Sequence, residues 1–156
     1  VDSPASLTHD DLREMIRDST SILVPVLPSA IDIHAAARCI ADLLLVAKID
    51  RQDNKLAVIA NRTRRNTKSF EKLMRFLNSL GIPVIAVIRD SQNFVRAAEQ
   101  GIGIVEMQPH KVRKDLVELE KIIKWLDTMP NERPALLAED TIAPPGQRYP
   151  IAQADD

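Results

Sequence analysis

Polar side chains stand at the points where three buried strands are expected to end, and Val1 is expected to be all that remains of the first strand. They are Asp2 with Ser3, Asn61 with Arg62, and Arg89 with Asp90 and Ser91. Ligands of open α/β sheets bind at the carboxyl ends of the strands. A carboxylate there can hold a water molecule of hydrated Mg²⁺, and a carboxamide can both donate to and accept from the edge of a purine. These positions therefore suit a nucleotide site.

Some of these residues also have a plainer structural role. A terminal Asp-Ser-Pro such as the one that begins at Asp2 is typical of a helix or turn cap, and the asparagine at position 61 is a routine turn former. Asp90 or Ser91 can cap a following helix. The three histidines and the single cysteine lack the spacing of a metal site.

Positive charge is concentrated between residues 62 and 75, where six Lys or Arg side chains accompany a single glutamate. The net charge of the whole chain is only −1. Contacts with DNA phosphates need such a density of cations, and they give weak, salt-sensitive affinity. The candidate DNA contacts are Arg62, Arg64, Arg65 and Lys68. A solvated helix face is the alternative interpretation of the same residues.

Apolar runs predict strands at residues 22–26, 56–60, 83–88 and, more weakly, 102–105. The first three are continuously apolar, which is typical of strands buried on both faces of a parallel sheet. Helical patterns follow each run; they cover residues 30–47, the stripe from Phe70 to Leu80, the region of Phe94 to Ala98, and the stripe from Val112 to Leu126. The predicted class is α/β, with a mostly parallel sheet and helices on both faces.

The composition limits the class of protein. Hydrophobic residues make up 45% and charged residues 28% of the chain, as in ordinary globular proteins. The single cysteine, Cys39, excludes an intrachain disulfide and stands in an apolar helix pattern that predicts a core position. No apolar run approaches the roughly 20 residues of a membrane helix. We expect a folded domain over residues 1–129, a proline-rich flexible tail over 130–156, and a cytoplasmic location.

Several segments together resemble the C-terminal half of ParA/MinD-type deviant Walker ATPases, in the branch that partitions chromosomes and plasmids. They are VDSPASL at 1–7, ILVPVLPSAIDIHAAAR at 22–38, LAVIANR at 56–62, GIPVIAVIRDSQNFVRAAEQGIGIVE at 81–106, and the helix that follows. The resemblance covers about residues 1–127 and lies in the order and spacing of these segments.

The resemblance implies a site for ATP and Mg²⁺. Asp2 would be the Walker-B-like catalytic aspartate, which helps to hold the magnesium water and the attacking water. Asn61 would read adenine. The other nucleotide-binding positions would be Arg62, Arg89, Asp90 and Ser91.

The resemblance also implies partners. Such proteins form ATP-sandwich dimers, bind DNA non-specifically or a membrane, and hydrolyse ATP faster when a partner protein is present. The implied partners are a second copy of the chain in the intact form, nucleoid DNA, and a ParB-like or cargo protein. The proline-rich sequence after residue 127 differs from the amphipathic membrane helix of MinD-like proteins, so no membrane partner is expected.

The 156 residues contain no Gly-x-x-x-x-Gly-Lys-Ser/Thr phosphate loop and only 4 glycines. We therefore interpret the chain as an incomplete P-loop NTPase fold that lacks the Walker A half and is inactive as an ATPase by itself. The strand at 22–26 would then form an exposed apolar edge, which predicts self-association of the isolated chain. The alternative is a stand-alone, non-catalytic α/β interaction module or regulator, with the helix over 30–47 as its partner surface.

Overall fold

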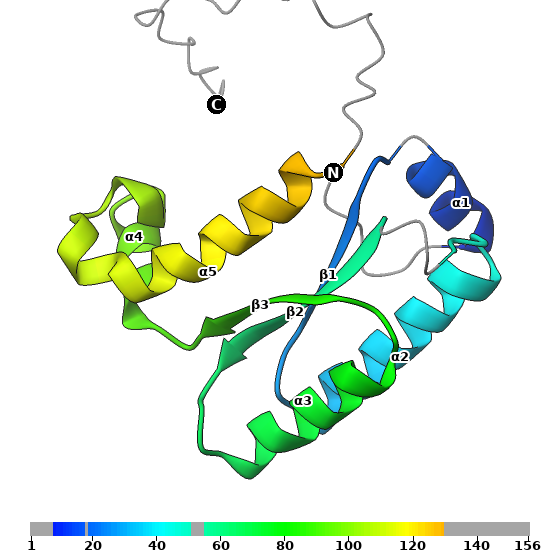
Figure 1. The fold of residues 1–156 in the computed structure, drawn as a ribbon, viewed down its shortest axis with the longest axis horizontal. Coiled ribbons are helices and arrows are strands. Elements are labelled where there is room, and N and C mark those ends of the chain that lie inside the picture. Colours follow the sequence, from blue (N-terminus) through cyan, green and yellow to red (C-terminus); the bar gives the residue numbers. More distant parts are fainter. Residues whose placement is uncertain (1–7, 18, 51–54, 130–156) are drawn as a thin grey trace, which may run out of the picture.

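The computed structural model describes residues 8–17, 19–50 and 55–129. Its elements are α1 (His9–Arg17), β1 (Ile22–Val26), α2 (Ala30–Leu45), β2 (Leu56–Thr63), α3 (Lys68–Ser79), β3 (Val84–Arg89), α4 (Gln92–Glu99), the 3₁₀ turn η2 (Ile104–Glu106) and α5 (Pro109–Asp127) (Figure 1). The three strands form one parallel sheet in the order β1-β2-β3, flanked by helices, which confirms the predicted class. The expected tail over 130–156 lies outside the described residues.

The central position of β2 in the sheet explains why the sequence of this strand is continuously apolar. Every residue from Leu56 to Ala60 is buried. Helices α2 and α3 pack against one face of the sheet, where Leu43 and Leu77 join Val58 in the main core. Helix α5 runs along β3 (Figure 1), and its Glu118 carboxylate accepts the Val87 N–H at the outer edge of that strand. The side chains of β2 are therefore buried on both faces of the sheet, and its two edges pair with β1 and β3.

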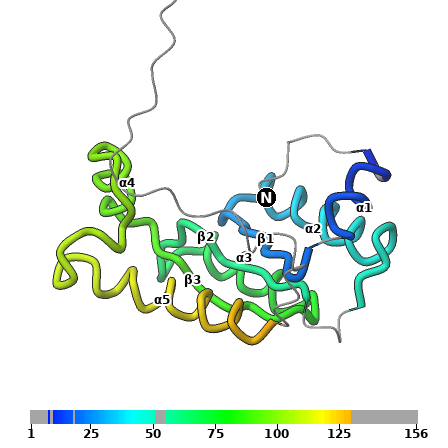
Figure 2. Tube along the Cα trace, turned by 90° about the horizontal axis from the view of Figure 1, so that it is seen from above, coloured from blue at the N-terminus to red at the C-terminus, as the bar shows by residue number. Residues whose placement is uncertain are grey.

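A second, smaller apolar cluster lies apart from the main core. It consists of Ala97 from α4, Ile104 from η2 and Val112 from α5, with partly buried neighbours. Seen from above, α4 and α5 lie at one end of the molecule, while α1 and α2 lie at the other (Figure 2). The chain thus places one group of helices beyond the carboxyl ends of the strands.

Local signals in the sequence set the helix boundaries. The Ser29 hydroxyl accepts a hydrogen bond from the Asp32 N–H at the start of α2, at 3.1 Å, and the Thr67 hydroxyl accepts one from the Phe70 N–H at the start of α3, at 3.2 Å. After α3 the chain turns at Gly81, whose φ of +64° lies in the left-handed region that glycine adopts without strain. None of the described helices is both long and apolar enough to cross a bilayer.

Two expectations about the fold are wrong. Residues 102–105 do not form a strand: they turn into η2, where the Gly103 N–H donates to the Glu106 carboxylate at 2.6 Å. Ile104 packs in the second cluster instead of beside β3, whose outer edge is approached by α5. Cys39 is exposed rather than buried, because the buried stripe of α2 runs through Ala36, Ile40 and Leu43.

The sequence patterns used above missed helix α1. Its start carries a capping pair, in which the Thr8 N–H donates to the Asp11 carboxylate at 3.1 Å and the Asp11 N–H donates to the Thr8 hydroxyl at 3.2 Å. Leu12 and Ile16 then pack against the main core at helical spacing. Within the described sheet β1 is an edge strand paired with β2, so self-association through β1 stays a prediction.

Candidate functional site at the carboxyl ends of the strands

A pocket of about 540 Å³ lies between the ends of β2 and β3 and helix α4. All five residues that the resemblance assigns to nucleotide binding outside the N-terminal segment line it: Asn61, Arg62, Arg89, Asp90 and Ser91. The remaining lining residues are Ile88, Phe94, Val95, Ala98 and Glu99. We call this cavity the base pocket, after the nucleotide base that the resemblance to ParA/MinD-type ATPases predicts here.

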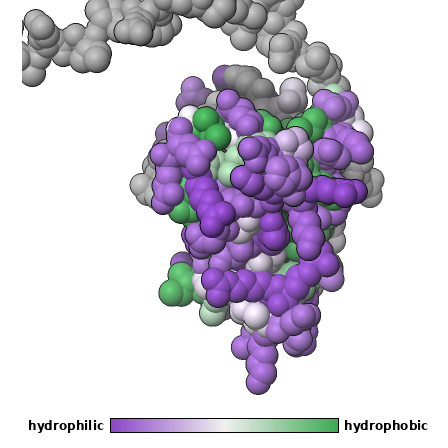
Figure 3. Space-filling model, turned by 90° about the vertical axis from the view of Figure 1, so that its left-hand side faces the viewer, coloured by the Kyte–Doolittle hydropathy of each residue, from purple (hydrophilic) through white to green (hydrophobic). Residues whose placement is uncertain are grey.

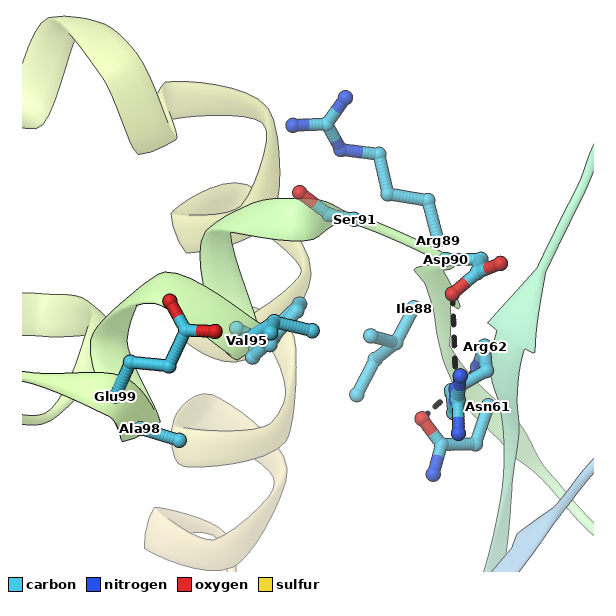
Figure 4. A pocket seen from close by; sticks show the side chains of 10 residues that line it. Asn61, Arg62, Ile88, Arg89, Asp90, Ser91, Val95, Ala98 and Glu99 are labelled. Carbon is cyan, nitrogen blue, oxygen red and sulfur yellow. Dashed lines mark hydrogen bonds and ion pairs between the residues drawn. The ribbon is translucent and has the colours of Figure 1, made fainter.

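The walls of the base pocket come from two parts of the molecule. Asn61 and Arg62 extend from β2 on one side, while Val95 and Glu99 extend from α4 on the other (Figure 4). Ile88 lies between these walls (Figure 4). An aromatic ring can be held against such aliphatic side chains while polar groups at the rim fix its orientation.

The end of β2 leaves regular strand geometry inside the pocket wall. The pairing with β3 shifts between Ala60 and Thr63, and Arg62 has a φ of +47°. The Asn61 side-chain oxygen accepts the Arg62 N–H at 2.9 Å, which fixes the carboxamide beside the bend. The Thr63 hydroxyl donates to the Ile88 carbonyl at 3.0 Å, so the irregular end of β2 remains tied to β3. Non-glycine residues in this backbone region concentrate at functional sites.

Asp90 follows β3 and pairs with two arginines from the end of β2. Its carboxylate lies 2.7 Å from the Arg64 Nη2 and 3.6 Å from the Arg62 Nε. The hydrogen bond from Arg64 is the main cause that lowers the pKa of Asp90. Both arginine side chains are largely exposed, with 68% of Arg62 and 76% of Arg64 accessible, so solvent and salt weaken these pairs.

Arg89 directs its guanidinium away from the base pocket (Figure 4). Its Nε and Nη2 donate to the two carboxylate oxygens of Asp115 on α5, at 2.5 and 2.8 Å. The Asp115 side chain is fully buried and also accepts from the Asn93 amide at 2.8 Å and the Ser91 hydroxyl at 3.3 Å. The hydrogen bond from Arg89 is the main cause that holds the pKa of Asp115 below its usual value, against the opposing effect of burial.

A second pocket, of about 600 Å³, lies beside the same loop and is bordered by β2, β3 and α5. We call it the basic pocket, since four cationic side chains line it: Arg64, Arg65, Arg89 and Lys114. Its floor includes Glu118, which accepts the Val87 N–H at 2.8 Å and thereby anchors α5 to the outer edge of β3. Partial burial raises the pKa of Glu118, but the hydrogen bonds from Lys121 and the Val87 N–H act in the opposite direction. The net result is a lowered pKa.

The remaining predicted site residues are placed differently. Asp2, the predicted catalytic and magnesium-side residue, lies outside the described residues. Among the candidate DNA contacts, Arg62 and Arg64 share Asp90, Arg65 lines the basic pocket, and Lys68 begins α3 outside both linings. No group of three or more His, Cys, Asp or Glu side chains that could hold a metal ion occurs in the described part of the chain.

Two residues of the site, Asp115 and Glu99, were not predicted from the sequence. Asp115 carried a readable signal, because it follows Val112 by three residues and precedes Leu116, which places an acidic residue on the apolar stripe of α5.

The left-hand face of the molecule in Figure 1, toward which β2 and β3 run, has a mainly hydrophilic surface interrupted by isolated hydrophobic side chains (Figure 3). The base pocket therefore belongs to a largely polar face.

Comparison with curated proteins gives a distant similarity. The chain is 25% identical over 108 residues to the Maintenance of carboxysome distribution protein A of Halothiobacillus neapolitanus, a ParA-family protein. The alignment covers 69% of this chain and 50% of that protein, so the chain spans about half the length of the relative that it matches. No family model and no solved structure matches the chain. The similarity supports a distant relationship to the ParA family.

Proposed function

We propose that this chain supplies the base-binding side of a ParA-type ATP site. In the intact form, ATP-dependent dimerisation and hydrolysis would be coupled to the positioning of DNA or another cargo. The observation that carries the proposal is the convergence of Asn61, Arg62 and the loop from Arg89 to Ser91 on one pocket. The distant similarity to a ParA-family protein supports the same assignment.

The chemistry of the described residues fits the adenosine part of ATP. Ile88, Phe94 and Val95 give the pocket an apolar surface for a purine ring, and Asn61 brings a carboxamide to its edge. The Glu99 carboxylate, on the opposite wall, can accept hydrogen bonds from the nucleotide (Figure 4). The magnesium side rests on Asp2, outside the described residues, so the proposal for Mg²⁺ follows from the resemblance alone.

Binding is the appropriate test, because the 156 residues contain no Walker A motif. AMP titrated into the chain should shift the amide NMR signals of the base pocket. Asn61→Ala should weaken AMP binding about tenfold through loss of a base hydrogen bond. Asn78→Ala, on the exposed surface of α3, is the matched control and should bind AMP like the wild type. Shifts that map elsewhere, or equal effects of the two variants, would contradict the proposal.

The basic pocket favours phosphate contact as a second property of the same protein. Two side chains of the connection between β2 and α3, Arg64 and Arg65, converge there with Lys114 of α5. Such a cluster suits the phosphates of duplex DNA, with affinity that falls steeply as salt rises. Retention on DNA that is independent of salt would contradict this assignment.

An interaction module remains the competing proposal. Helix α2 exposes 82% of Ile31 and 76% of Leu45, which is unusual for large apolar residues of one helix. Under this proposal Ile31→Lys with Leu45→Lys would abolish association with a partner and leave AMP binding unchanged. Under the ATPase proposal the base pocket would remain the principal functional surface.

A further inference from the structure

The base pocket spans the junction between the two apolar clusters. One wall belongs to the sheet, whose β2 contributes to the main core, and the other belongs to α4, whose Ala97 lies in the second cluster. The width of the pocket therefore depends on how α4 is held against the strand ends. Apolar packing inside each cluster does not by itself fix that separation.

Asp115 joins the parts that meet at this junction. From α5 it binds Arg89 at the end of β3, Ser91 at the cap of α4, and Asn93 in the first turn of α4. Ser91 in turn accepts the Asn93 N–H at 3.2 Å and caps α4. One buried carboxylate thus fixes the whole connection from β3 to α4, although Asp115 does not line the base pocket.

We infer that Asp115 is a positioning residue, which sets the placement of α4 and of the loop from Arg89 to Ser91 and thereby the selectivity of the base pocket. The inference rests on the proposed nucleotide function. It adds a residue from α5, outside the pocket lining, that controls base discrimination through the groups it holds.

The chemistry of the network explains why an ionised aspartate is needed. Arg89, Ser91 and Asn93 all point donors at its two oxygens, and a carboxylate offers acceptors alone. Asparagine at this position would direct its NH₂ group at one of those donors. The substitution keeps the size of the side chain and removes the match, so the loop and α4 would lose their common anchor.

Glu118 provides a matched comparison on the same helix. It is also a largely buried carboxylate of α5 that binds β3, but through the Val87 N–H, and it contacts neither the loop nor α4 through a hydrogen bond in the described structure. Glu118→Gln removes the charge of this contact, but the glutamine carbonyl can still accept the Val87 N–H and keep α5 attached to the sheet. It should leave the connection between β3 and α4 intact.

The experiment compares AMP with GMP, which share a phosphate and differ in the base. The chain, Asp115→Asn and Glu118→Gln are each titrated with both nucleotides, and amide hydrogen exchange of residues 89–93 is measured without nucleotide. We expect Asp115→Asn to lose about tenfold in AMP affinity and most of its preference over GMP, since small misplacement of binding groups is costly. Its 89–93 amides should exchange faster. Glu118→Gln should keep the preference and the slow exchange.

A double variant tests whether Asn93 acts through Asp115. Asn93→Ala should lower AMP affinity by a few-fold, and the double variant with Asp115→Asn should bind no more weakly than Asp115→Asn alone. Additive losses, or an unchanged AMP preference in Asp115→Asn, would overturn the inference. A wild-type chain that binds neither nucleotide would refute the proposed function, and unchanged exchange in Asp115→Asn would refute the positioning role separately.

Discussion

The base pocket and the basic pocket have similar volumes, about 540 and 600 Å³, and both are lined by Arg89 and Asp90. Their other linings differ in kind. The base pocket is floored by aliphatic and aromatic side chains from β3 and α4. The basic pocket gathers charged side chains from the connection between β2 and α3, from the end of β3 and from α5. One short loop therefore borders two cavities of opposite chemistry.

The difference shows how a loop can serve two surfaces without mixing them. Its two carboxylate contacts go in different directions: Arg89 binds the fully buried Asp115, while Asp90 binds the exposed Arg62 and Arg64. A pair whose carboxylate is fully buried and multiply bonded has a fixed geometry, whereas a pair with largely exposed arginines provides charge that salt can screen. The contact with Asp115 therefore fixes the position of the loop. The contacts of Asp90 with Arg62 and Arg64 respond to the salt concentration.

The largest expected effect comes from filling each of the two pockets in turn with a tryptophan side chain. Ala98 is exposed on the base-pocket wall, and Val117 is a half-exposed residue of the basic pocket. Ala98→Trp should reduce AMP affinity about a hundredfold, because the indole occupies the volume that the base needs. Val117→Trp should leave AMP affinity within about twofold of the wild type, since its indole enters the other cavity. Equal losses in the two variants would mean that the pockets are not separate sites.

A second test compares the two carboxylate contacts by stability. Asp115→Asn should lower the free energy of unfolding by about 1–3 kcal/mol at pH 7, the usual cost of unsatisfied buried donors. Asp90→Asn should have a smaller effect that disappears in high salt, because its partners are exposed. Urea unfolding of the three proteins at low and high salt measures both effects. A larger loss from Asp90→Asn would reverse the roles assigned to the two contacts.

The acid limb of the same stability measurements gives a third test. The folded-state pKa of Asp115 is lowered, so its stabilising contribution is complete above the unfolded pKa of about 3.9 and is lost as the pH falls through the folded value. The difference in unfolding free energy between wild type and Asp115→Asn should therefore shrink below about pH 4. Lowered pKa values of Asp90 and Glu118 add to the acid limb of both proteins and cancel in this difference.

The smallest expected effect concerns DNA. Arg65→Glu combined with Lys114→Glu should weaken duplex binding about tenfold and flatten the dependence of log K on log salt by about two, since each lost phosphate contact removes roughly 0.9 from the slope. AMP affinity should not change, because neither residue lines the base pocket. Lys124→Glu, on the exposed surface of α5 and outside both linings, is the single-site control. Greater loss from Lys68→Glu would place the DNA contact on α3 instead of the basic pocket.

The sequence predicted most of the fold because its strongest signals are local. Continuous apolar runs located β1, β2 and β3, and the apolar stripes with their caps located α2, α3 and α5. The run at 102–105 was misleading, because four residues with three apolar side chains and a glycine fit a turn packed on a helix as well as they fit a strand. Helix α1 was missed since its short polar sequence has only Leu12, Met15 and Ile16 as an apolar face.

The site was predictable to the extent that parallel strands align their carboxyl ends. That rule placed Asn61 and Arg62 near Arg89, Asp90 and Ser91, and these residues share a pocket. The direction of a side chain does not follow from such a rule. Arg89 turns to Asp115, which lies 26 residues further along the chain, and this pairing depends on the path of α5 beyond the end of β3.

The left-handed backbone at Arg62 has a consequence for how this surface can be redesigned. A residue with a Cβ is strained there by about 1 kcal/mol, a cost that glycine avoids and asparagine reduces. Substitution by either should remove the positive charge from the mouth of the cavity while relieving the chain, whereas valine or isoleucine should distort it. The charge at the rim of the base pocket can therefore be changed at Arg62 without destabilising the backbone. This makes position 62 a suitable first site for a mutational library.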